Sequence, residues 1–132
     1  MRVFIVEDSI LVQERLVDLA TGVEGVEIVG QGDDVVESIK AIRELRPDVV
    51  ILDLQLRGGS GLDVLDAIKS GDRPPAAIVL TNYPYPQYQK RAREKGAEYF
   101  FDKSSEFHKV PDALREIRLK EGQKGWNALY AS

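Results

Sequence analysis

Short apolar runs recur along the chain, and the longer segments between them alternate apolar and polar positions with the period of a helix. Most runs are continuous and rich in β-branched or aromatic residues, as is typical of strands buried on both faces. They predict strands over 2–7, 26–31, 48–53, 76–82 and 98–102. The intervening segments predict helices over 9–21, 34–45, 61–70, 86–95 and 106–121.

Local signals support several of these boundaries. Asp34 and Ser60 are good helix N-caps, and Glu37 three positions after Asp34 is a capping-box partner. Gly96 is a typical residue just beyond the end of a helix. Strict alternation of strand and helix with connections of this length predicts an α/β fold, a (βα)5 doubly wound sheet of five parallel strands.

Composition narrows the class of protein without identifying it. The 132 residues suffice for about one domain with a sizeable core. The chain has no cysteine, which excludes disulfides, thiolate zinc sites and a cysteine nucleophile. A net charge of −4 argues against binding nucleic acid or an anionic membrane through bulk charge. No apolar run approaches the roughly 20 residues of a membrane span. We expect a cytoplasmic protein, and the lack of cysteine fits a reducing cytosol.

The candidate chemistry lies where the predicted strands end. Glu7 and Asp8 follow the first strand, Asp53 ends the third, Thr81 ends the fourth and Lys103 follows the fifth. Each residue alone is more often an ordinary solvated loop residue. Together they point to a site, because the carboxyl ends of parallel strands meet at one edge of the sheet.

Three of these residues are carboxylates, and their mutual repulsion would cost stability unless a cation relieved it. Hard oxygen ligands with room for water suit Mg²⁺, with Mn²⁺ as a possible substitute. The acidic group therefore predicts a divalent metal site.

These residues, at the ends of these strands, carry a resemblance to a known family. Over about residues 2–120 the chain resembles the receiver domain of two-component response regulators (CheY-like). The matching positions are Glu7, Asp8, Asp53, Gly61, Thr81 and Lys103. The resemblance implies a flavodoxin-like strand order of 2-1-3-4-5 and a phosphoacceptor of two-component signalling rather than an enzyme.

The resemblance also implies a role for each residue. Asp53 would accept a phosphoryl group from a histidine kinase or phosphotransfer protein, and Lys103 would pair with the phosphoryl oxygens. Thr81 and Phe100 would be the switch residues. Mg²⁺ would be held by Glu7, Asp8, Asp53 and the backbone carbonyl of Gln55. A downstream protein partner would bind the face formed by the fourth helix, fifth strand and fifth helix.

The chain departs from the family pattern in two loops. Ser104 and Ser105 follow Lys103, where receivers commonly have a proline, as in receivers that carry helix-turn-helix output domains. Glycines at 58, 59 and 61 predict a loop after the third strand that is looser than usual.

We expect a receiver domain over residues 1–121 and a short C-terminal tail over 122–132, too short for an output domain. Trp126, Leu129 and Tyr130 have the spacing of a short amphipathic turn. Two alternatives stay open: a receiver excised from a longer DNA-binding regulator, and a Mg²⁺-dependent phosphate-handling enzyme on the same fold.

Overall fold

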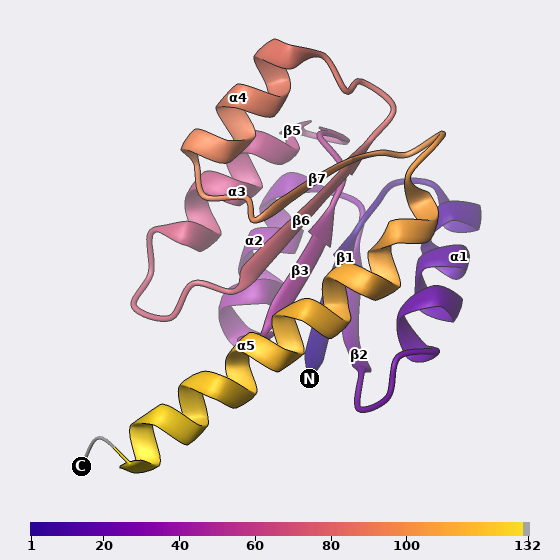
Figure 1. The fold of residues 1–132 in the computed structure, drawn as a ribbon. Helices are drawn as coiled ribbons and strands as arrows, with labels where there is room; N and C mark the ends of the chain where they lie inside the picture. Colours follow the sequence, from indigo (N-terminus) through magenta and orange to yellow (C-terminus); the bar gives the residue numbers. More distant parts are fainter. Residues whose placement is uncertain (131–132) are drawn as a thin grey trace.

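One parallel sheet forms the centre of the molecule, with strands in the order β2-β1-β3-β6-β7 (Figure 1). The computed structural model describes the backbone of residues 1–130 and the side chains of residues 1–121. The sheet consists of β1 (Arg2–Val6), β2 (Glu27–Gly32), β3 (Val49–Leu52), β6 (Ala76–Thr81) and β7 (Tyr99–Asp102). When only these five parallel strands are numbered along the chain, their order is 2-1-3-4-5, so the predicted fold is confirmed.

Helices cover both faces of the sheet. They are α1 (Ile10–Thr21), α2 (Val35–Leu45), α3 (Gly61–Lys69), α4 (Pro86–Glu94) and α5 (Val110–Tyr130). The alternation of side chains along β1 sends Val3 and Ile5 into the core under α1 and α5. Phe4 and Val6 enter the second core, under α2, α3 and α4. Burial on both sides explains the continuous apolar runs.

Hydrogen bonds at the helix starts agree with the sequence signals. The Asp34 carboxylate accepts the backbone N–H of Glu37 at 3.0 Å. The reciprocal capping box occurs at Ser60 instead, where the Asp63 side chain accepts the Ser60 backbone N–H. Gly96, with φ of 100°, follows the end of α4 as expected.

The loop after β3 differs from the prediction. It forms a small antiparallel hairpin of β4 (Gln55–Leu56) and β5 (Gly59–Ser60) instead of a loose segment. Gly58 occupies the turn with φ of 79°, which favours glycine. The carbonyl of Arg57 accepts the Val35 N–H at 3.1 Å, and the Arg57 side chain pairs with Asp33. The hairpin is therefore fastened to the start of α2.

The last helix also begins and ends differently from the prediction. A 3-10 turn, η1 (Phe107–Lys109), which contains the exposed His108, precedes α5. The helix then continues past residue 121 to Tyr130. The side chains of Trp126, Leu129 and Tyr130 lie outside the described residues. No helix in the described part of the chain is long and apolar enough to span a membrane.

Candidate functional site

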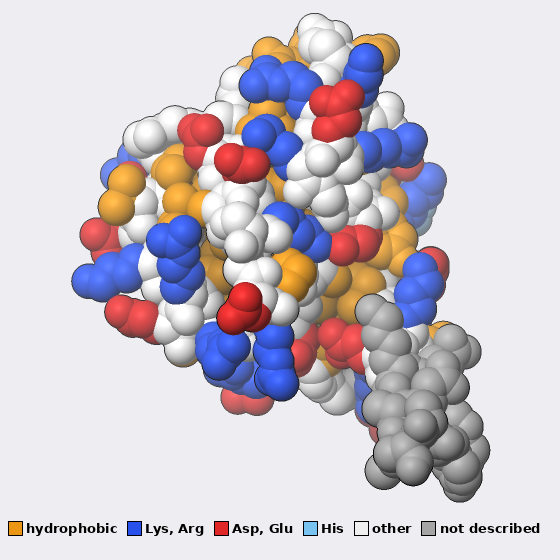
Figure 2. Space-filling view, turned by 90° about the vertical axis from the view of Figure 1, so that its left-hand side faces the viewer, with side chains coloured by type: hydrophobic (Ala, Val, Ile, Leu, Met, Phe, Trp, Pro, Cys, Tyr) orange, Lys and Arg blue, Asp and Glu red, His pale blue; other side chains and the backbone are white. Residues whose placement is uncertain are grey.

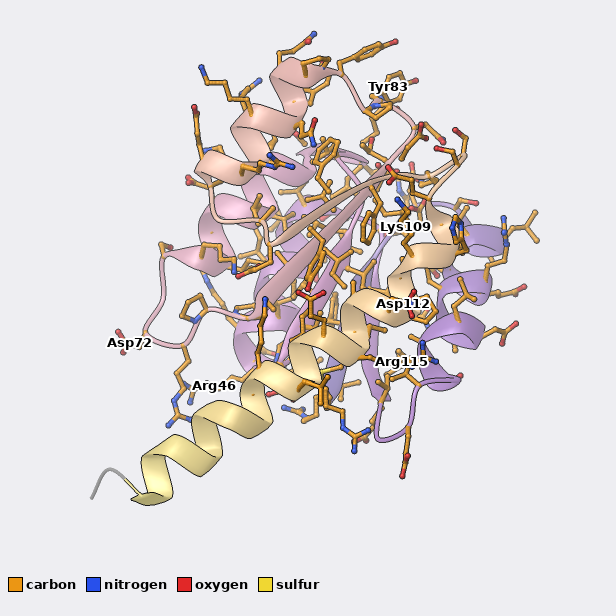
Figure 3. The ribbon with its side chains drawn as sticks, viewed as in Figure 1. Arg46, Asp72, Tyr83, Lys109, Asp112 and Arg115 are labelled. Atoms are coloured by element: carbon orange, nitrogen blue, oxygen red, sulfur yellow. The ribbon has the colours of Figure 1, made fainter. Side chains whose placement is uncertain are left out.

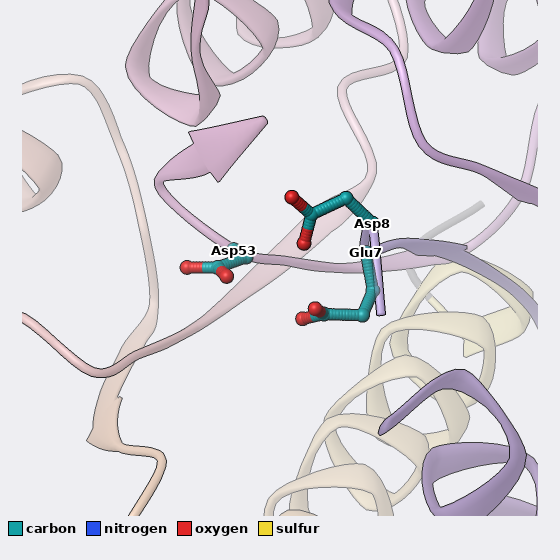
Figure 4. A group of neighbouring side chains, drawn as sticks. All are labelled: Glu7, Asp8 and Asp53. Carbon is teal, nitrogen blue, oxygen red and sulfur yellow. The ribbon is translucent and has the colours of Figure 1, made fainter. Parts of the chain in front are cut away.

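Backbone pairing brings three carboxylates together at the carboxyl edge of the sheet. The N–H of Asp53 donates to the carbonyl of Val6 at 3.0 Å, which places the end of β3 beside Glu7 and Asp8 after β1. Oxygen atoms of the three carboxylates all lie within 4.8 Å of one another. Figure 4 shows Glu7 and Asp8 extending from the end of β1 toward the side on which Asp53 lies.

Lys103 bridges two of these carboxylates. Its backbone N–H donates to the carbonyl of Thr81 at 2.8 Å, which ties the end of β7 to the end of β6. Its Nζ lies 2.7 Å from Asp53 Oδ2 and 2.8 Å from Glu7 Oε2. The three side chains are almost fully buried, with 9% of Lys103, 7% of Asp53 and 2% of Glu7 exposed. Lys103, Asp53 and Glu7 thus form ion pairs that are shielded from solvent.

Burial shapes the protonation of the cluster. Removal from water raises the pKa of Glu7, and the hydrogen bonds from Lys103 and Ser9 only partly oppose this effect. Burial lowers the pKa of Lys103, but its hydrogen bonds to Asp53 and Glu7 outweigh burial, so the net effect raises the pKa. Lys103 is therefore a cation at neutral pH.

The donor chemistry fits a divalent metal. Three carboxylates against one ammonium leave two negative charges in the cluster. Asp8 is exposed, so the cluster is open to solvent on that side. The donors are hard oxygens, which suit Mg²⁺. Gln55 is adjacent, since its N–H donates to Asp53 Oδ1 at 3.3 Å, but a metal-binding role for its carbonyl stays a prediction.

The two expected switch residues lie on neighbouring strands, Thr81 on β6 and Phe100 on β7. Thr81 ends β6 and is completely buried, and its Oγ1 accepts the backbone N–H of Tyr83 at 3.1 Å. Phe100 is half-buried in β7 and packs against the core under α2, α3 and α4.

Sequence reasoning missed two contacts at this edge. The bond between Lys103 and Glu7 joins residues 96 positions apart, and no local pattern indicates it. The bond between Thr81 and Tyr83 had a local signal, because a threonine hydroxyl often accepts the N–H two residues ahead in a turn.

Gly61 permits the close approach of α3 to Asp53. A Cβ atom at Gly61 would lie 1.9 Å from the Asp53 carbonyl oxygen. We expect Gly61→Ala to lower the free energy of unfolding by roughly 2–4 kcal/mol, within the range for severe steric substitutions. Urea unfolding followed by circular dichroism measures the change.

Gly71→Ala is the matched control, because nothing lies within 4 Å of a Cβ there. Its effect should be within about 1 kcal/mol. Equal stability of the two variants would show that β3 and α3 can separate without cost.

Known proteins resemble this chain over nearly its whole length. The profile of the response regulator receiver domain matches residues 3–115. The sensory transduction protein LytT of Bacillus cereus is 29% identical over 92% of this chain and 48% of its own length. The transcriptional regulatory protein BtsR of Salmonella typhi is 32% identical over 94% of this chain and 51% of its own length. The chain thus spans about half the length of these curated relatives.

Solved structures agree with these relatives. A DNA-binding response regulator of the LuxR family from Staphylococcus aureus superposes with a TM-score of 0.81 at 25% identity, over 88% of this chain and 97% of that chain. The isolated REC domain of RcsB from Salmonella enterica serovar Typhimurium, solved in the presence of phosphomimetic BeF3-, gives a TM-score of 0.82 at 26% identity. That match covers 89% of this chain and 88% of that chain.

Proposed function

This chain belongs to the response regulator receiver domain family, and from that premise we propose that Asp53 is its phosphoacceptor. The observation that carries the proposal is the buried cluster in which Lys103 bridges Asp53 and Glu7 beside the exposed Asp8. Phosphoryl transfer depends on positioning and on neutralising the phosphoryl oxygens, and this cluster supplies both. The donor is a histidine kinase or a phosphotransfer protein.

In the transfer, a carboxylate oxygen of Asp53 attacks the phosphorus of a phosphohistidine. The new P–O bond forms as the P–N bond breaks, and the bonding pair stays with the imidazole nitrogen. Lys103 already lies against Asp53 Oδ2, so its charge is in place to pair with the incoming phosphoryl oxygens. Glu7 holds Lys103 from the other side.

Mg²⁺ is the cofactor that the donor set favours, with Glu7, Asp8, Asp53 and the Gln55 carbonyl as its proposed ligands. When bound, it supplies positive charge to the phosphoryl oxygens. Asp8 would contribute the exposed carboxylate of this ligand set, on the side where the cluster is open to solvent.

Mg²⁺ should raise the melting temperature of the protein, because it binds the folded carboxylate cluster and not the unfolded chain. At a Mg²⁺ concentration of one hundred times Kd, the free energy of unfolding should rise by about 2.7 kcal/mol. Asp8→Ala should lose most of this gain in a thermal denaturation series, whereas Asp18→Ala on the exposed face of α1 should keep it. An undiminished Mg²⁺ response in Asp8→Ala would remove Asp8 from the site. Because burial raises the pKa of Glu7, the response should fade as the pH drops through that pKa.

The signal is proposed to leave through the surface of α4, β7 and α5, where a downstream protein binds. Thr81 gains a hydrogen bond only when a phosphoryl group is present, and such a differential contact shifts a conformational equilibrium. Its movement would free space into which Phe100 turns. The half-buried position of Phe100 between the core and the surface supports this route.

Thr81→Ala should still accept a phosphoryl group but respond less to it. Addition of beryllofluoride and Mg²⁺ to the parent should shift amide resonances across 83–95 and 98–115, and the variant should show smaller shifts. Thr81→Ser keeps the hydroxyl and should respond like the parent. Full shifts in Thr81→Ala would exclude the hydroxyl as the switch.

A further inference from the structure

A groove of about 570 Å³ opens beside the proposed phosphorylation site, between the β4–β5 hairpin and α4. Its lining includes Asp8 and Gln55, which lie next to Asp53, and Tyr88 and Arg91 of α4. We call it the hairpin–α4 groove. Its volume falls within the roughly 300–1,000 Å³ typical of ligand sites. It is lined by residues of α3 and α4, and among the described residues none of β7 or α5 lines it, which distinguishes it from the α4–β7–α5 surface.

The groove has an apolar and aromatic wall. Leu54, Leu56 and Leu62 line it, together with Tyr83 and Tyr88. The rings of Tyr83, Tyr85 and Tyr88 form a ladder, with centroid separations of 6.3 Å and 6.1 Å. Figure 3 shows Tyr83 in the loop that leads from β6 to α4. Tyr83 and Tyr85 are exposed and Tyr88 is half-buried, and tyrosine rings offer contact area to an apolar side chain at a low entropic cost.

The helix α4 brings one cation, Arg91, to the groove. Residues 90–95 contain four cations and one anion, but Lys90 pairs with Glu94 and Lys95 with Asp66. Arg91 is exposed and has no ion-pair partner among the described side chains. Figure 2 shows Lys and Arg side chains around α4 with hydrophobic surface between them. The unpaired guanidinium group of Arg91 beside an apolar wall favours an anionic ligand with an apolar anchor.

The two anionic residues among the described lining residues of the groove have other partners. Asp63 accepts the Ser60 N–H in the capping box of α3. Asp8 belongs to the carboxylate cluster, where a bound divalent cation would offset its charge. The groove therefore becomes more favourable for an anion when the proposed metal site is filled.

A hydrogen bond connects this groove to the proposed switch. The Tyr83 N–H donates to Thr81 Oγ1 at 3.1 Å, and Tyr83 is part of the groove wall. A movement of Thr81 toward a phosphoryl group would alter or break this bond. The groove wall then shifts whenever the switch residue moves.

We propose that the hairpin–α4 groove binds an acidic peptide segment of a partner protein, with a carboxylate on Arg91 and an apolar side chain against Tyr83 and Tyr88. Phosphorylation of Asp53 changes the affinity through Thr81 and Tyr83, and the peptide reciprocally changes the occupancy of the phosphorylated state. This coupling rests on the proposed function of Asp53, whereas peptide binding itself does not.

The test uses the full chain and a fluorescein-labelled synthetic peptide in which glutamates flank one phenylalanine. Fluorescence anisotropy measures binding in Mg²⁺, with and without beryllofluoride. Arg91→Ala should weaken binding about tenfold or more, the usual effect of losing a hydrogen bond to a charged group. Lys40→Ala removes the same charge from the exposed face of α2, away from the groove, and should change little. A peptide with glutamines in place of glutamates should bind poorly.

Equal losses in Arg91→Ala and Lys40→Ala would overturn the proposal, because they would reveal binding through bulk charge. Equal affinity for the glutamine peptide would overturn it as well. For the coupling, beryllofluoride should change the affinity of the parent more than that of Thr81→Ala. In parallel, the protein is incubated with Mg²⁺ and a small-molecule phosphodonor, and mass spectrometry measures phosphorylation of Asp53. An affinity that beryllofluoride leaves unchanged, in a protein that the phosphodonor does phosphorylate at Asp53, would refute the coupling and leave the proposed function intact. Absence of phosphorylation would refute the proposed function, and Arg91→Ala would still decide whether the groove binds.

Discussion

Asp53→Asn is expected to abolish phosphorylation of this protein by any phosphodonor. The amide keeps the shape of the side chain and an oxygen that can accept from Lys103, but it is not a nucleophile. Intact-mass spectrometry after incubation with Mg²⁺ and a small-molecule phosphodonor measures the effect. The parent should gain one phosphoryl group, and the variant should gain none.

Asp66→Asn is the matched control, because Asp66 is an exposed carboxylate of α3 away from the cluster. It should be phosphorylated like the parent. Phosphoaspartate at parental yield in Asp53→Asn would move the acceptor elsewhere. Repeated release of phosphate by the parent, with no phosphorylated protein detected, would favour the alternative of a phosphate-handling enzyme.

Lys103→Met is expected to cause the largest loss of stability among these variants. It removes the only cation that pairs with the buried Asp53 and Glu7 within the described residues. Leaving buried charges without their partner typically costs about 3–5 kcal/mol. Urea unfolding at neutral pH without divalent metal should show a loss of this size, and the variant should also respond least to beryllofluoride.

Lys109→Met provides the comparison. Lys109, labelled in Figure 3, pairs with Glu106, but the two side chains are 50% and 32% exposed. Such a solvent-accessible pair contributes about 0–1 kcal/mol. Similar losses in both lysine variants would mean that the buried cluster does not depend on Lys103 for charge compensation.

Two further measurements isolate the electrostatic origin of the loss. Glu7→Gln in the Lys103→Met background should restore part of the stability, because one uncompensated carboxylate is then neutral. Burial raises the pKa of Glu7 above its unfolded value even beside Lys103. Between the pKa of Glu7 in the unfolded chain and its raised pKa in the folded state, the folded state therefore binds more protons. The stability of Lys103→Met should fall as the pH rises through the raised pKa.

The strand runs and the residues that end them were readable from the sequence, since both are local properties. A continuous apolar run such as Val49–Leu52 can be satisfied only by burial on both faces, which requires helices on both sides of a parallel sheet. Parallel strands share their carboxyl edge, so the proximity of Asp8 and Asp53 followed from that topology. The family resemblance, carried by the same residues, is confirmed.

Element ends were predicted less well because they depend on tertiary partners. The β4–β5 hairpin needed the turn at Gly58 and the bond from Val35 to Arg57, and the sequence shows only a glycine-rich loop there. The predicted end of α5 at 121 was also too early, because the apolar period on which it rests ends there while the helix continues to Tyr130.

Two arrangements were decided by the tertiary structure alone. Lys103 lies 96 positions from Glu7 and 50 from Asp53, so no local pattern could reveal that one ammonium serves both carboxylates. The hairpin–α4 groove combines residues from the ends of β1 and β3, the hairpin, α3 and α4. Residue types and their periodicity determine which elements form and which face is buried. The distances between side chains on separate elements exist only once the sheet has packed, and those distances decide which charges pair and which stay available to a ligand.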